Sequence, residues 1–410
     1  MDPAVRAARA ALAKNPLNVG AWNEVLRLSV REPPEKRREV FEEYLELFPT
    51  RASVWRQYIE FEIAHKHYEQ TKELFKRCLM KCPFIGLWEL YIKFLEDTNT
   101  PREEMLSALK LAVDTMKPDI DSYSLWRKYI NLFKNEPTDG KRPHEVSRLT
   151  MDTRSLYQTS IALPHRGVDK IWKEYLDWET NMNQAIASKY TKEKGPLHSN
   201  ARAVTAKIEQ LCRRLRKDFP SLPPEMRDGI LAEQQRLWEQ LVAYERSNPL
   251  KLDHDHLVVE RVYFVYRQYL LCFNRYPTVW YEAAMYLHDA ARAAQTKGDT
   301  ESAERWQGAA NALLAEGRTA CPADLILHFA HADLLETQAN IPEAKKIYKS
   351  LLAQPDLPNA TLVYVQFLKH TRRTEGVKAA REVFKAARSD DRVDHHVYTA
   401  SAMMELARLK

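Results

Sequence analysis

The sequence predicts an all-α protein built as a helical-repeat solenoid, and three observations lead to this prediction. Glycine is scarce, with 10 residues in 410, whereas proteins on average contain about 7%. A tryptophan-centred motif recurs along the chain, and proline closes several of the apolar segments between its copies. Because tight hairpins, phosphate loops and positive-φ turns depend on glycine, a chain so poor in glycine is expected to be mostly helical.

The motif is clearest at Trp55, where the chain reads Trp55-Arg-Gln-Tyr58-Ile59-Glu-Phe61-Glu62. Large apolar residues stand at positions +3, +4 and +6 from the tryptophan, and an acid stands at +7. Positions 0, 3, 4 and 7 share one face of an α-helix. A ligand-binding aromatic box is the alternative, but the regular recurrence favours packing between helices. The residues assigned to this repeat core are Trp22, Trp55, Tyr58, Trp88, Tyr91, Trp126, Tyr129, Trp172, Tyr175, Trp238 and Trp280.

A second apolar helix is expected between successive motifs. The intervals Trp22 to Trp55 and Trp55 to Trp88 are both 33 residues, which is typical of repeats that contain two antiparallel helices. The final unit has only its first helix, so the carboxy-terminal end is expected to be truncated. We predict about ten helix pairs, whose first helices begin near Ala21, Ser53, Leu87, Ser124, Asp169, Leu237, Thr278, Asp324, Asn359 and His395.

Position +4 separates the candidate repeat classes. The tetratricopeptide pattern has glycine there, whereas this chain has Ile59, Ile92, Ile130, Leu176 or Val242. Together with the acid at +7, this bulky residue resembles the half-a-TPR (HAT) repeat, which occurs in proteins of RNA-processing complexes.

Three prolines, at positions 220, 223 and 224, cannot lie within one helix. We therefore predict an amino-terminal HAT block at residues 1–217, a proline-containing linker at 218–226 and a carboxy-terminal HAT block at 227–410. The two blocks are expected to meet at an angle.

No catalytic residue, cofactor site or metal site is predicted. The motifs of nucleophile elbows, Walker loops and zinc proteases are absent. Cys78 and Cys82 share a helix face without a further zinc-type pair, and the segment 253–256 (Asp-His-Asp-His) opens a helix, where polar groups suit free amides. Five scattered cysteines indicate a reducing compartment. No apolar run long enough for a transmembrane helix is present.

The basic residues between positions 189 and 217 are the strongest charge feature of a chain with net charge +6. Such a run is able to follow an RNA backbone or bind an acidic partner. No aromatic ladder is interleaved with it, which favours the alternative of a solvated helix face. A smaller basic patch, formed by Arg372 and Arg373, lies near Gly376. The candidate contacts are Lys189, Lys192, Lys194, Arg213, Arg214, Arg216, Lys217, Arg372 and Arg373.

Several segments are more specific than the repeat itself. Together they resemble the Suppressor-of-forked family, the HAT-repeat scaffold subunit of cleavage stimulation factor, and they follow the family order over nearly the whole chain. These segments are Glu73–Met80, Ser247–Leu250, Trp280–Ala284, Thr361–Tyr364, Arg372–Gly376 and His395–Tyr398.

The resemblance implies a nuclear scaffold of messenger RNA 3′-end cleavage and polyadenylation, without enzyme activity or membrane contact. It implies homodimerisation through the second block, attachment of a WD-repeat subunit, and binding of an RNA-recognition-domain subunit through a proline-rich tail. This sequence departs from the pattern because it stops before the last repeats and that tail. Two alternatives remain at this point: direct RNA binding through residues 189–217, or a HAT scaffold of splicing or ribosomal RNA processing.

Overall fold

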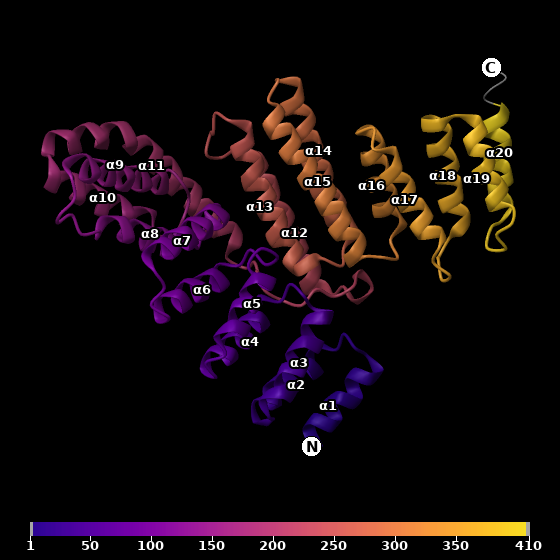
Figure 1. The fold of residues 1–410 in the computed structure, drawn as a ribbon, viewed down its shortest axis with the longest axis horizontal. Coiled ribbons are helices and arrows are strands. Elements are labelled where there is room, and N and C mark those ends of the chain that lie inside the picture. Colours follow the sequence, from indigo (N-terminus) through magenta and orange to yellow (C-terminus); the bar gives the residue numbers. More distant parts are fainter. Residues whose placement is uncertain (1–2, 407–410) are drawn as a thin grey trace. The chain divides into compact units, whose positions relative to one another are not determined.

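The computed structural model describes residues 3–406. This part of the chain contains twenty α-helices, two short 3₁₀-helices and no strand, as the sequence predicts (Figure 1). It divides into two compact units, Met1–Phe273 and Asn274–Lys410. The unit boundary falls between two helices, one helix pair after the proline-containing segment 218–226.

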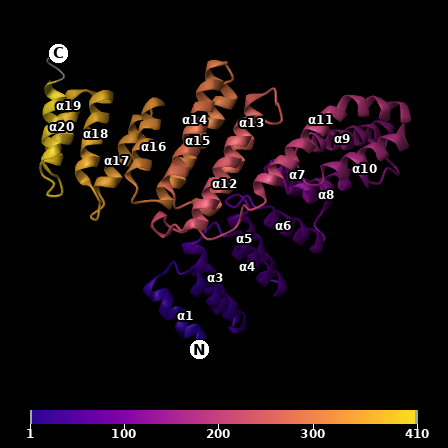
Figure 2. The same ribbon diagram turned by 180° about the vertical axis from the view of Figure 1, so that it is seen from behind.

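The first unit begins with an additional helix, and antiparallel helix pairs then follow one another along the chain (Figures 1 and 2). Its helices are α1 (Pro3–Lys14), α2 (Val19–Leu28), α3 (Pro34–Leu47), α4 (Ala52–Ala64), α5 (Tyr68–Cys78), α6 (Ile85–Asp97), α7 (Arg102–Met116), α8 (Tyr123–Lys134), α9 (Pro143–Ile161), α10 (Val168–Met182), α11 (Gln184–Cys212), α12 (Gly229–Arg246) and α13 (Asp255–Phe273), with 3₁₀ turns η1 (Ser29–Arg31) and η2 (Pro224–Met226).

The second unit continues the same pairing of neighbouring helices. Its longest pair, α14 and α15, consists of helices of 20 and 21 residues that pack side by side (Figure 1). The helices are α14 (Pro277–Thr296), α15 (Thr300–Ala320), α16 (Leu325–Thr337), α17 (Ile341–Leu352), α18 (Ala360–Glu375), α19 (Val377–Ala387) and α20 (His395–Leu406).

Local sequence explains where many helices begin. The side chains of Asn18, Asp228, Asp324 and Asn359 each accept a hydrogen bond from a main-chain N–H of the first turn, which satisfies an otherwise unpaired donor. Proline occupies the first turn of α3, α9, α14 and α17, where its missing N–H costs nothing. These signals place the boundaries independently of tertiary contacts.

The predicted first helices are confirmed, with one correction. Nine of the ten begin within two residues of their expected positions. The exception is α12, predicted near Leu237 but beginning eight residues earlier at Gly229, because Asp228 caps the helix there. Trp238 therefore lies in the middle of its helix, so the motif marks the packed face of a helix rather than its start.

Candidate partner-binding surfaces

The motif tryptophans and tyrosines lie between the paired helices. The tryptophans at 22, 55, 88, 126, 238 and 280 and the tyrosines at 58, 129 and 175 are at most 9% exposed, whereas Tyr91 and Trp172 are half-buried. Rings of neighbouring helices stack directly: Phe41 and Tyr58 have centroids 4.8 Å apart, and Trp238 and Tyr269 are 5.7 Å apart. Most of this aromatic surface is therefore covered by the protein itself.

The indole group has a recurring polar role as well. In Trp22, Trp55 and Trp280, the indole N–H donates to a main-chain oxygen six residues earlier, at 2.7, 2.8 and 2.8 Å. Each bond ties the first turns of a helix to the loop that precedes it. Because the acceptor carbonyl lies near a helix end, where intrahelical partners run out, the bond helps to set the angle at which the next helix begins.

The acid at +7 of the motif is buried and paired. The carboxylates of Glu62, Glu179 and Glu245 are at most 3% exposed. Each accepts two hydrogen bonds from one guanidinium on an adjacent second helix, at distances of 2.5–3.0 Å. A buried carboxylate needs such a partner because its desolvation is costly. The three partners are Arg38 on α3, Arg154 on α9 and Arg261 on α13.

The sequence interpretation recognised these acids but missed their arginines. Arg38 and Arg154 precede their acids by 24 and 25 residues, whereas Arg261 follows its acid by 16. The partner thus comes either from the previous second helix or from the following one. An arginine inside α3, α9 and α13 is the signal that could have found them.

The electrostatic balance at Glu62 favours the charged pair. Burial alone would raise the pKa of this carboxyl, but hydrogen bonds from Arg38 and from His67 hold the pKa below its usual value. The carboxylate therefore stays ionised at neutral pH and keeps α3 and α4 together.

The basic run between positions 189 and 217 does not form one surface patch. Lys189 and Lys192 are exposed near the start of α11, and Arg213 and Arg216 are exposed just after its end. At about 1.5 Å per helical residue, the two groups lie roughly 35 Å apart. Within the run, Lys194 pairs with Glu193 and Arg214 with Glu233, both at 2.8 Å.

The interpretation of Lys217 as a surface contact requires correction. Its ammonium binds Asp119 at 2.9 Å and Asp121 at 3.1 Å, and Gln268 of α13 donates to the same Asp119 carboxylate. Burial raises the pKa of Asp119, but the charge of Lys217 outweighs this effect and holds the pKa below its usual value. An RNA phosphate would have to displace two carboxylates to reach this lysine.

The residue that follows, Asp218, ties the same segment to the first repeats. Its carboxylate lies 3.3 Å from the guanidinium of Arg51 and accepts hydrogen bonds from the main chain of Ala52 and Ser53. Asp218 thus caps α4 from 166 residues away in sequence. The beginning of the segment predicted as a linker is therefore packed against the first unit's own helices.

The second predicted patch is also engaged within the protein. Arg373 makes two hydrogen bonds to Glu336, at 2.7 and 2.8 Å, and His370 binds the same carboxylate at 2.6 Å. Arg372 is half-buried beside them. This cluster joins α16 to α18.

The cysteines considered as metal ligands, Cys78 and Cys82, are buried, and their thiols lie 3.8 and 3.7 Å from main-chain oxygens. Another group, not predicted, brings one ligand atom each of Asp394, His395 and His396 within 4.8 Å of one another, and all three are exposed. Asp394 accepts hydrogen bonds from the main chain and imidazole of His396 at the start of α20. This geometry is that of a helix cap.

None of the helices between residues 3 and 406 combines the length and apolarity needed to cross a bilayer.

The fold and its buried motif define the class of protein: a helical-repeat protein whose paired helices are held together by aromatic packing and arginine–glutamate pairs.

The chain belongs to the family described as Suppressor of forked protein (Suf), which it matches over residues 4–410. It is 32% identical to "Protein suppressor of forked" of Drosophila melanogaster, covering 95% of this chain and 55% of that protein. It is 27% identical to "mRNA 3'-end-processing protein RNA14" of Yarrowia lipolytica, covering 96% of this chain and 51% of that protein. The chain thus spans about half the length of these relatives.

A solved structure shows the same fold. The crystal structure of CstF-77 superposes with a TM-score of 0.57 at 17% sequence identity, covering 87% of this chain and 69% of that one.

Proposed function

We propose that this chain serves in messenger RNA 3′-end cleavage and polyadenylation, as a non-enzymatic nuclear scaffold that holds partner subunits. The observation that carries the proposal is the family match from residue 4 to 410, together with a relative whose name states mRNA 3′-end processing. The fold suits the role, because stacked helix pairs expose a long surface while each pair keeps its own core. The partners are other cleavage and polyadenylation subunits: one with an RNA-recognition domain and one with WD repeats.

Purification of the tagged chain from nuclear extract tests the assignment. Recovery of cleavage and polyadenylation factors supports it. Recovery of splicing factors or of ribosomal RNA processing factors instead would assign the chain to those pathways and contradict the proposal. A control destabilised in both halves of the chain, the double variant Trp55→Ala/Trp238→Ala, should recover less of either group.

Homodimerisation through the second block, residues 227–410, is part of the proposal. Ile326 in the first turn of α16 is 67% exposed, and Met151 on α9 of the first block is 66% exposed. Large exposed apolar side chains are typical anchors of interfaces. The two residues therefore offer a matched pair of variants, one in each block.

Sedimentation at micromolar concentration measures the dimer. We expect Ile326→Glu to shift the chain toward monomer and Met151→Glu to leave the dimer intact. A strict monomer for the unsubstituted chain, or equal loss in both variants, would remove the dimer from the proposal.

Direct RNA binding is a second candidate, supported by the exposed cations at the two ends of α11. Neutralising phosphates releases counterions, so affinity should fall steeply with salt. We expect Arg213→Glu/Arg216→Glu to weaken binding of a GU-rich oligonucleotide, and Lys72→Glu on α5 to leave it unchanged. The absence of a salt-dependent interaction would end this candidate.

A further inference from the structure

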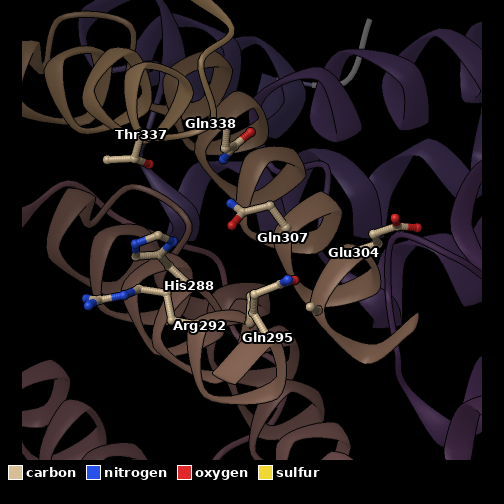
Figure 3. A pocket seen from close by; sticks show the side chains of 9 residues that line it. His288, Arg292, Gln295, Glu304, Gln307, Thr337 and Gln338 are labelled. Atoms are coloured by element: carbon tan, nitrogen blue, oxygen red, sulfur yellow. The ribbon is translucent and has the colours of Figure 1, made fainter. Parts of the chain in front are cut away.

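A hollow of about 400 Å³ opens in the second unit, where α14 turns into α15 and α16 ends (Figure 3). Its volume lies within the range typical of ligand pockets, about 300–1,000 Å³. The buried alanines Ala291 and Ala303 line it. Their small side chains leave the space that aromatic residues fill between other helix pairs.

Two polar helix faces border this hollow. On α14, His288, Arg292 and Gln295 follow one another at intervals of four and three residues, which places them on one face. On α15, Glu304 and Gln307 are three residues apart and face the same space. Figure 3 shows the Gln307 side chain between those of Gln295 and Gln338.

These five side chains make no hydrogen bond or ion pair with any other residue of the described chain. Many other charged side chains of the second unit are paired. Elsewhere in the unit, Lys345 pairs with Glu375 at 2.7 Å and Arg381 with Glu405 at 2.7 Å. At the hollow, even the buried Nδ1 of His288 and Nε2 of Gln307 lack a partner. Arg292, Gln295 and Glu304 are exposed to solvent. The two buried atoms raise the free energy of the folded chain while they lack a partner, so their position in one concavity indicates a place for a ligand.

We propose that this hollow binds an extended polypeptide segment that carries an acidic side chain. A side-chain amide donates and accepts hydrogen bonds at the same time, as does the main chain of an extended peptide, so Gln295 and Gln307 suit it. The guanidinium of Arg292 suits a carboxylate in two-point geometry.

The charges at the rim distinguish a peptide from a nucleic acid. Glu304 lines the hollow from α15 and Arg292 from α14. A single acidic side chain can end at Arg292, whereas a nucleic-acid backbone carries a charge on every phosphate and would extend negative charge toward the Glu304 carboxylate. The Gln338 side chain, which lines the hollow at the end of α16, is held in place because the amides of Asn311 and Gln338 exchange hydrogen bonds at 2.9 and 3.3 Å. The hollow therefore offers one cation, one anion and several amides, a set that matches a peptide and not a polyanion.

Selection from a phage library of random seven-residue peptides on the full chain tests the proposal. The best peptide is then labelled, and its affinity is measured by fluorescence polarisation for the unsubstituted chain and for three variants. We expect peptides with an acid at a fixed position, bound at least tenfold more weakly by Arg292→Glu and by Gln307→Met. The matched control Lys369→Glu, at an exposed position of α18, should change affinity less than twofold.

A second substitution, in the peptide, locates the contact. Replacing its acid by alanine should weaken binding to the unsubstituted chain and cause no further loss in Arg292→Glu. Failure to enrich any peptide, or equal affinity in all variants, would overturn the inference. So would a uridine oligonucleotide whose binding depends on Arg292, or a dimer that dissociates in Arg292→Glu. These measurements use the purified chain and stand apart from its role in 3′-end processing.

Discussion

The pair formed by Glu245 and Arg261 allows a stringent test of how this repeat is held together. Both side chains are almost fully buried, at 3% and 7% exposure, and two hydrogen bonds of 2.9 and 2.7 Å join them. Removing one partner leaves the other buried without its counter-charge. The expected cost of Glu245→Leu or of Arg261→Met is therefore about 3–5 kcal/mol each.

The double variant Glu245→Leu/Arg261→Met should behave differently. Apolar residues of similar volume often replace a buried ion pair at little cost, because no charge is left to be desolvated. We expect the double variant to lie within about 1 kcal/mol of the unsubstituted protein. The coupling between the two sites should then reach at least about 5 kcal/mol, far outside the additivity expected of independent positions.

Native-state hydrogen exchange of α12 and α13 is the appropriate assay, because a repeat protein need not unfold in one step. It reports the free energy of local opening. Losses in the double variant equal to the sum of the single losses would refute the reasoning. Such a result would mean that the residues act by filling space and not as a charge pair.

Three further predictions concern stability. Trp55→Ala should open a cavity costing about 3–5 kcal/mol, and hydrogen exchange should show the loss mainly in α3 to α6; uniform loss would contradict this. Gly317→Ala places a Cβ 2.9 Å from the Trp280 ring and should cost about 1–3 kcal/mol, whereas Gly308→Ala, with nothing within 4 Å, should not lower the melting temperature. Burial, with the charge of Arg318, lowers the pKa of His331 to about 4. Since the unfolded imidazole takes up its proton near pH 6.5, stability should fall as pH drops from about 6.5 toward 4; His331→Gln should flatten that decline in thermal melts.

The sequence alone predicted the helix pairs well, because their signals are local. The helical spacing of aromatic residues, capping residues such as Asn18 and Asp324, and proline at first turns all act within a few residues. The prediction was wrong at α12 because Trp238 lies far from the cap of its helix. Capping chemistry, and not the motif, decides where a helix begins.

The tertiary structure decided what the charged residues do. Lys217 resembled its exposed neighbours in sequence, yet it is held by Asp119, 98 residues earlier, which also accepts from Gln268, 149 residues later. The arginine partners of the motif acids likewise come from either side in sequence.

Scarce glycine, helical periodicity and proline by themselves determined that this protein is a solenoid of paired helices, because each pair folds largely on its own contacts. The pairing of its charges and the hollow between α14, α15 and α16 were decided only by the tertiary structure. Coulombic and hydrogen-bond partners are chosen by distance in space, and no periodicity along the chain records that distance.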